Sequence, residues 1–182
     1  MIQRRNSRIL PRIQPNATAT MNIASIDFET ANNADASICA AGLAVFQDGI
    51  LAESLYWLVR PPKGFGWFRE DFTECHGLTW FDVQNAPEFP AIAPEFLHRL
   101  TRADLVIAHN AAFDERKLRG TLSHFGFECP DFEFFCTLQM SRRVWPDLPI
   151  SVLEPWPSIS VTNFIITTPR TTPQRLDTYY WQ

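Results

Sequence analysis

The sequence predicts one mixed α/β domain, and three observations support this. Strand patterns follow one another in the first part of the 182-residue chain, and helix then alternates with strand, as in a mixed sheet flanked by helices. With 46% hydrophobic residues, including fifteen Phe and six Trp, the chain can bury one core. A net charge of −4 excludes a broad cationic face that grips duplex nucleic acid, but not an enzyme that holds only a strand end.

Three strands are expected first. Residues 22–28, 37–46 and 50–61 are rich in apolar residues, an Asp-Gly pair separates the second from the third, and a Pro-Pro pair ends the third. Residues 61–86 fit a loop with short helical pieces. The first three strands are therefore predicted to form a meander.

Helices and strands alternate in the next part of the chain. Residues 86–102 have apolar side chains at helical spacing, residues 103–110 fit a short buried strand, and residues 111–127 fit a helix with a glycine near its end. Residues 132–146 fit a strand that runs into a helix closed by Pro146. The apolar stripe expected on the helix in 111–127 consists of Phe113, Leu118, Leu122 and Phe125.

Cysteine usage and the chain's first residues bear on location. The four cysteines include no C-x-x-C pair, which favours buried, reduced thiols in a cytoplasmic protein; His124, Cys129 and Cys136 are a weak zinc alternative because their spacing is poor. No apolar window approaches the roughly 18 residues of a membrane span. Residues 1–20 hold four Arg and no acid, and we expect a disordered extension, with a mitochondrial transit peptide as the alternative.

Two carboxylates stand close together at the end of the first strand. Asp27 and Glu29 are two residues apart, so strand alternation places them on the same face, where like charges repel unless a cation lies between them. Asp114, near the start of a helix after a buried strand, can approach the same sheet edge. Taken singly, each acid fits a solvated strand end or helix N-terminus. Three together suit Mg²⁺ or Mn²⁺, and two such ions can assist phosphodiester hydrolysis.

A family resemblance strengthens this interpretation. The segments "IDFET", "HGLTWFDVQNAP" and "AHNAAFDERKL", in this order, resemble the first two motifs of the DnaQ-like (DEDD) 3′–5′ exonucleases, relatives of the epsilon proofreading subunit of bacterial DNA polymerase III. The resemblance covers residues 21–149 and implies an RNase H-like fold and two-metal hydrolysis at a 3′ end. It also implies that Asp27 bridges both metals, that Glu29 binds the first and that Asp114 holds the second.

The same resemblance implies contacts with substrate. A nucleic-acid 3′ end, DNA rather than RNA, is the expected partner, together with a DNA polymerase subunit. An aromatic side chain such as Phe113 can stack on a base without reading sequence, although it equally fits a core anchor of its helix. The residues that the resemblance places around the terminal nucleotide are Phe28, Thr30, His76, His109 and Phe113.

The family's third motif, a His followed five residues later by an Asp, is absent. After Asp114 the only histidine is His124, which lies too early in the chain. In the family the His serves as general base and the Asp completes the shell of the first metal. We therefore expect an RNase H-like sheet whose C-terminal helix is lost or replaced, and an exonuclease with little or no activity. The alternative function is a non-catalytic RNase H-like module that binds a nucleic-acid end or a polymerase partner.

The composition changes at about Pro149. Residues 150–182 contain no Ala, Gly, Lys, His, Cys or Met, but six Thr and four Pro, and we expect them to be a poorly ordered, aberrant tail. A base missing near the Pro149 codon is one explanation: with suitable third bases, the shifted frame encodes "HHHDAPDDA", which contains the missing His and Asp. The alternative is a genuine divergent tail. The exonuclease domain is then a truncated unit of residues 21–149.

Overall fold

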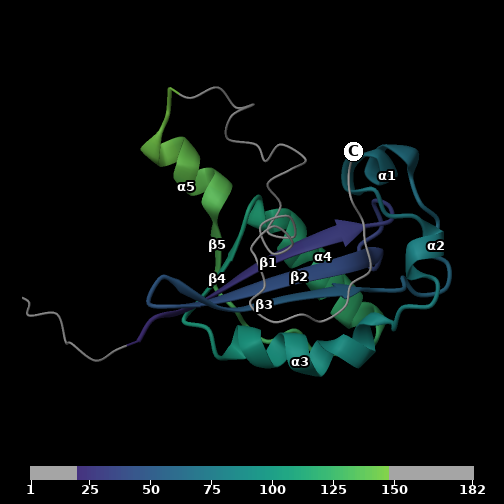
Figure 1. The fold of residues 1–182 in the computed structure, drawn as a ribbon, viewed down its shortest axis with the longest axis horizontal. Helices are drawn as coiled ribbons and strands as arrows, with labels where there is room; N and C mark the ends of the chain where they lie inside the picture. The colour runs from purple at the N-terminus through teal and green to yellow at the C-terminus, as the bar shows by residue number, and fades with distance from the viewer. Residues whose placement is uncertain (1–19, 148–182) are drawn as a thin grey trace, which may run out of the picture.

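The computed structural model describes residues 20–147 (Figure 1). Five strands form one sheet in the order β3-β2-β1-β4-β5, in which β1, β2 and β3 are antiparallel while β1, β4 and β5 run parallel. The predicted tail, the frameshift and the replaced C-terminal helix lie outside the described residues, as does the extension before Thr20. The strands are β1 (Asn22–Thr30), β2 (Ile38–Gln47), β3 (Ile50–Leu58), β4 (Leu105–Ala108) and β5 (Phe134–Cys136).

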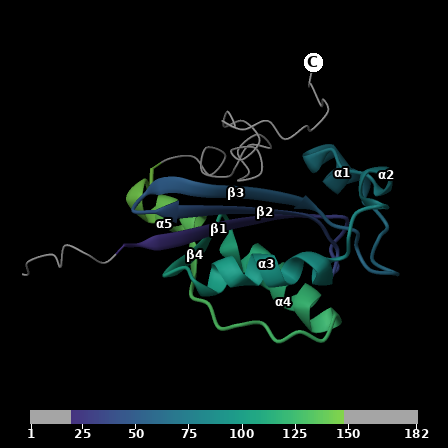
Figure 2. The same ribbon diagram turned by 60° about the horizontal axis from the view of Figure 1, so that its bottom comes forward.

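Five helices accompany the sheet in the described part of the chain. Figure 2 shows α3 and α4 together under one face of the sheet, and α1 and α2 beyond the end of β1. None of the helices within residues 20–147 is long and apolar enough to cross a membrane. Their bounds are α1 (Glu70–His76), α2 (Trp80–Val83), α3 (Phe89–Thr101), α4 (Ala111–His124) and α5 (Thr137–Val144).

The core lies between the sheet and helices α3 and α4. Alternation along β1 turns Ala24, Ile26 and Phe28 toward these helices, and all three are at most 3% exposed. The Phe28 ring contacts Phe89 and Phe96 of α3, with ring centroids 6.4 and 5.5 Å apart. Full burial of one such side chain contributes about 1.5–3 kcal/mol. The other face of β1 is thereby left for polar side chains.

Strand β4 is short, and this shapes the sheet at the far end of β1. The β1–β4 pairing covers only Ile23 to Ser25 on β1, opposite Leu105 to Ile107. Beyond Ser25, no strand of residues 20–147 pairs with the edge of β1 that faces away from β2, because the chain turns at Asn110 (φ 63°) into α4. The N-terminal turn of α4 therefore lies beside the last residues of β1.

The buried face of α4 differs from the apolar stripe that the sequence predicts. Leu118 and Leu122 are fully buried as expected, but Phe113 is only half-buried and lies outside the core. Of the two alternatives for Phe113, the core anchor is not observed, since its ring is absent from the core cluster. Polar Lys117 and Thr121 instead share the buried face of α4, and Lys117 Nζ lies 5.3 Å from the Phe113 ring centroid. Phe113 instead borders the surface at the start of α4.

Candidate functional site

Three carboxylates come together where β1 ends. Asp27 and Glu29 lie on the face of β1 opposite Phe28, and Asp114 approaches from the first turn of α4. Asp114 is 2% exposed, and its Oδ1 accepts a hydrogen bond from the Phe28 backbone N–H at 3.1 Å. Because no described strand pairs with this edge of β1 beyond Ser25, the carboxylate satisfies an N–H that burial would otherwise leave unpaired. The fold thus joins acids from two distant segments.

The acids interact electrostatically. Burial, and then the nearby charge of Asp27, raise the pKa of Glu29 to about 7. Burial also raises the pKa of Asp114 well above its usual range, with Asp27 as the second cause, while the Phe28 N–H opposes the shift. Crowded carboxylates in a low dielectric disfavour one another's charged forms, so a cation at this position would relieve an existing repulsion.

The donor set fits a hard divalent cation. Carboxylate oxygens are the ligands that Mg²⁺ and Mn²⁺ prefer. The two basic residues that follow Asp114 on α4 are engaged elsewhere: Arg116 pairs with the Asp35 carboxylate, and Lys117 Nζ donates to backbone carbonyls. Within residues 20–147, no three His, Cys, Asp or Glu side chains are gathered tightly enough to form a ready-made metal cage. The fit therefore rests on donor chemistry and burial.

The loop after β1 is fixed to α4 by a buried lysine. Lys117 is 0% exposed, and its Nζ donates to the carbonyl oxygens of Asn32, Asn33 and Ala34 at 3.4, 3.0 and 2.7 Å. Charge-assisted bonds of this kind are stronger than neutral ones. Lys117 follows Asp114 by one helical turn, so one helix holds both the third carboxylate and the loop that continues from the first two.

His76 uses both ring nitrogens to hold backbone. The Leu78 N–H donates to Nδ1 at 3.0 Å, which leaves the proton on Nε2, and Nε2 lies 3.1 Å from the Thr30 carbonyl oxygen. Burial lowers the pKa of His76, although the Thr30 carbonyl opposes this shift. The ring ties the end of β1 to the end of α1, and its role in contacting a nucleotide stays a prediction.

The remaining predicted substrate residues take different positions. Phe28 reaches the site only by its backbone because its ring lies in the core, and Thr30 is 4% exposed with its carbonyl bound to His76. Phe113 is half-buried at the start of α4. His109 Nδ1 lies 3.1 Å from Thr137 Oγ1, and its buried Nε2 has no hydrogen-bond partner within the described residues. Their contacts with substrate stay predictions.

Tyr56 is a neighbour of the site that sequence reasoning missed. The sheet register aligns Asp27 with Gly42 and Gly42 with Tyr56, so all three face the same side. A glycine between them leaves room for the tyrosine ring to approach the carboxylates, and burial, followed by the charge of Glu29, raises the pKa of Tyr56. The glycine inside a strand was the available signal, but its meaning depends on a register that the sequence does not state.

Comparison with known proteins decides the family. A model of the exonuclease family, RNase T type, matches residues 24–155, which is most of the chain. The chain belongs to this exonuclease family. The DnaQ-like relationship predicted from the motifs is confirmed.

Two curated relatives resemble this exonuclease-family chain. It is 32% identical over 124 residues to the 3′–5′ exonuclease DinG of Bacillus subtilis, covering 66% of this chain and 13% of DinG. It is 30% identical over 80 residues to DNA polymerase III subunit epsilon of Buchnera aphidicola, covering 42% of this chain and 34% of that protein. The match therefore spans only a minor part of either relative.

Solved structures confirm the RNase H-like fold. Exonuclease X in complex with 5′-overhanging duplex DNA matches with a TM-score of 0.56 and 22% identity, covering 85% of this exonuclease-family chain and 78% of that one. The 3′-exonuclease from a structure on 3′-end recognition of histone mRNA stem-loop matches with a TM-score of 0.61 and 13% identity, over 75% and 68% of the two chains. At such identities the likeness shows the fold alone.

Proposed function

We propose that this chain is a metal-dependent 3′–5′ exonuclease acting on a nucleic-acid 3′ end. The observation that carries the proposal is the hydrogen bond between Asp114 Oδ1 and the Phe28 N–H, which fixes a third carboxylate beside Asp27 and Glu29. Asp27, Glu29 and Asp114 would hold Mg²⁺ or Mn²⁺. When bound, two such ions lower the pKa of a water and stabilise charge on the leaving oxygen of a phosphodiester.

The chain's own residues orient the reacting groups. The Phe28 backbone N–H holds the Asp114 carboxylate in place. The hydrogen bonds from Lys117 Nζ hold the loop after Glu29, and burial keeps bulk water from screening the acids. Phe113 is half-buried at the start of α4, where its ring can stack on the terminal base. These residues support positioning of a strand end without reading its sequence.

We further propose that the activity of this polypeptide is low. The family's general base is missing, and loss of a positioned base typically costs about 10²–10⁴-fold in rate. His76 is a poor substitute, because both ring nitrogens bind backbone and burial disfavours its protonated form. The chain's own residues therefore support metal and substrate binding better than turnover.

The test is a metal-dependent assay on 5′-labelled DNA and RNA strands. We expect slow shortening from the 3′ end with Mg²⁺ or Mn²⁺, and none with a chelator. Asp114→Asn removes this activity, whereas Asp131→Asn, which changes an exposed acid outside the site, leaves it unchanged. Activity that survives Asp114→Asn contradicts the site, and turnover as fast as that of an intact exonuclease contradicts the impairment.

A non-catalytic module is the second candidate, and the absent third motif favours it. The combined substitution of Asn at Asp27, Glu29 and Asp114 separates the two. If the acids bind an ion, Mg²⁺ raises the melting temperature of the wild type but not that of the variant. The reason is that a ligand stabilises only the state that binds it. A binding module gains stability from the substitutions, keeps its partner and shows no Mg²⁺ effect in either protein.

The substrate, the partner, the domain bounds and the location are further proposals. We propose DNA rather than RNA as substrate and a DNA polymerase subunit as partner, supported by the resemblance to DNA polymerase III subunit epsilon. We also propose residues 21–149 as a truncated exonuclease domain in the cytoplasm. Rates on DNA and RNA strands of the same sequence test the substrate, because only RNA presents a 2′-hydroxyl.

A further inference from the structure

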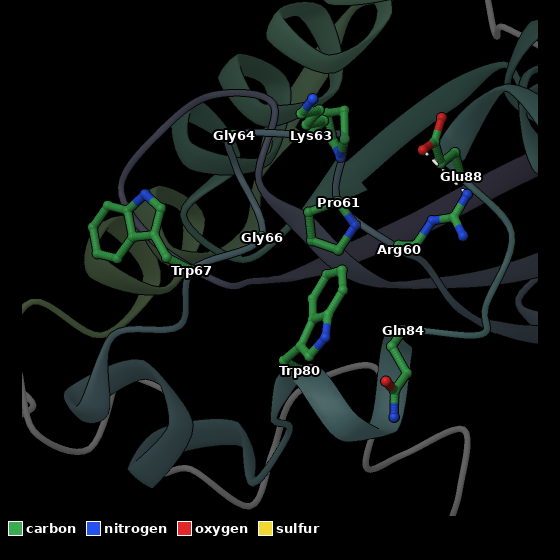
Figure 3. Close-up of a pocket in the computed structure, with 10 residues that line it drawn as sticks. Arg60, Pro61, Lys63, Gly64, Gly66, Trp67, Trp80, Gln84 and Glu88 are labelled. Atoms are coloured by element: carbon green, nitrogen blue, oxygen red, sulfur yellow. Dashed lines mark hydrogen bonds and ion pairs between the residues drawn. The ribbon is translucent and has the colours of Figure 1, made fainter.

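A groove lined by two tryptophans lies beside α2 (Figure 3). Its volume is about 650 Å³, and its walls come from the segment after β3 and from the start of α2. Trp67 is 57% exposed and Trp80 is 40% exposed. Because both rings line the same groove, they form an exposed apolar patch, and such patches often mark binding sites, whereas single exposed residues do not. The charged, proline and aromatic side chains that line the groove include Arg60, Pro61, Lys63, Trp67 and Trp80.

The backbone around the groove is specifically built. A Cβ on Gly66 would lie 2.7 Å from Trp80 Cζ3, so glycine at this position lets the indole pack against the loop. The Asn32 side chain donates to the carbonyl oxygens of Phe65 and Trp67, both at 2.8 Å. The segment that carries Trp67 is therefore held firmly while its ring stays exposed.

The groove loop is hydrogen-bonded to the segment that directly follows β1. Asn32 follows Glu29 by three residues, and the Arg69 N–H donates to the Ala31 carbonyl at 2.9 Å, so the groove loop is bonded to the two residues that follow β1. A short hydrogen-bonded stretch of backbone therefore joins the carboxylates of β1 to the loop that carries Trp67.

The groove also carries positive charge on an otherwise acidic chain. Lys63 is exposed and forms no ion pair with any described residue, whereas Arg60 shares its charge with Glu88 at 3.3 Å. Two cations against one carboxylate complement a phosphate backbone. A proline-rich peptide would use the aromatic rings but gain nothing from Lys63.

We propose that this groove binds a single-stranded stretch of nucleic acid, with the Trp67 and Trp80 indoles stacking on bases and Lys63 facing phosphates. Stacking of this kind is independent of sequence and sensitive to salt. That the bound strand is the one cleaved at Asp27, Glu29 and Asp114 rests on the proposed function; the binding itself does not.

Binding of a labelled oligothymidine to the full chain, followed by fluorescence anisotropy in a chelator so that no hydrolysis occurs, tests the groove. Trp67→Ala weakens binding by about 5- to 150-fold, as expected for one lost stack, and Trp67→Phe restores most of it. Lys63→Glu weakens binding further at low salt than at high salt. Phe81→Ala, an 80% exposed aromatic next to Trp80 but outside the groove, is the matched control and has no effect.

Two results overturn the inference. One is equal binding by the wild type, Trp67→Ala and Lys63→Glu; the other is a proline-rich peptide that binds the groove while the oligonucleotide binds elsewhere. Hydrolysis is measured separately with metal. Groove-dependent binding without hydrolysis supports the groove and contradicts the proposed function, whereas hydrolysis by a chain whose binding ignores Trp67 and Lys63 supports the function and contradicts the groove.

Discussion

Lys117 and His76 are the two basic side chains that hold the backbone around the carboxylates. Lys117 is fully buried and forms no ion pair with a carboxylate among residues 20–147, and its Nζ donates hydrogen bonds to three carbonyl oxygens of the loop after β1. His76 closes the same region from the other side, through the Thr30 carbonyl. Both residues act on the path of the chain directly after Glu29, so their loss affects the site through its scaffold.

Replacing Lys117 with methionine keeps the length of the side chain but removes every donor. Three carbonyl groups then lose a charged partner in a buried position, and we expect the free energy of unfolding to fall by roughly 2–4 kcal/mol. Urea denaturation followed by circular dichroism measures this. Lys63→Met, at an exposed lysine, is the control. If Lys117→Met lowers the free energy of unfolding no more than this control does, the hydrogen bonds from Lys117 do not stabilise the loop.

His76 makes stability depend on pH. Its pKa is lowered in the folded chain, so below its unfolded value of 6.5 the unfolded state takes up a proton more readily than the folded state. Stability is unaffected by this group above that pH and falls as the pH decreases through it. His76→Gln flattens the decrease in denaturation curves between about pH 7 and 5, while His98→Gln controls for the new glutamine. Parallel profiles for wild type and His76→Gln contradict this assignment.

At the scale of elements, helix α4 contacts both the carboxylate site and the loop between β1 and β2. Its first turn holds Asp114, and its middle receives the loop between β1 and β2: Thr121 Oγ1 donates to the Asp35 carbonyl at 3.3 Å, and Arg116 pairs with the Asp35 carboxylate at 3.2 Å. Gly120 permits this close approach, since a Cβ there would collide with Asp35 Cβ. The loop and the helix therefore fix each other's position.

Gly120→Ala tests the docking of this loop. Alanine improves helix propensity by about 1 kcal/mol, but the collision with Asp35 should cost more, for a net loss of roughly 1–2 kcal/mol. A lower melting temperature in calorimetry is the expected result. Ser123→Ala, at an exposed position of the same helix, should be neutral or slightly stabilising. If Gly120→Ala is also stabilising, the loop does not pack on α4 as described.

The elements themselves could be predicted well, because periodicity reports burial directly. The meander of β1, β2 and β3 and the helices α3, α4 and α5 lie where the apolar patterns place them. The polar buried face of α4 could not be predicted, since the partners of Lys117 are backbone carbonyls more than eighty positions away along the chain. Local patterns contain no record of such a pairing.

At the scale of the whole molecule, the site depends on pieces brought from distant segments. Strand alternation predicts the Asp27 and Glu29 pair, and a helix start after a buried strand predicts the approach of Asp114; the fold brings these acids together. The position of Tyr56 beside the acids could be recognised only once the sheet register was known. The tryptophan groove could be recognised only from the path of a loop that has no periodic pattern. Contacts that depend on loop paths are the part of the site that the sequence left open.

Restoring the missing third motif should change the exonuclease rate more than any other substitution described above changes stability or binding. A chain in which residues 150–182 are replaced by the shifted-frame segment containing "HHHDAPDDA" regains a His and an Asp, and we expect its exonuclease rate to rise by about 10²–10⁴-fold. Rates on the same labelled strand measure the gain. The control is that segment with its histidines changed to Gln, and equal rates for both chains contradict the frameshift hypothesis.

The bond between Asp114 and the Phe28 N–H gives the carboxylate a position that would otherwise belong to a neighbouring strand. A side chain held in a sheet ladder has already lost its rotational freedom during folding, so little further entropy is lost when a ligand arrives. Such preorganisation lowers the reorganisation that chemistry would demand at this point. The entropy cost of fixing the Asp114 side chain is therefore met during folding and does not recur each time a ligand binds.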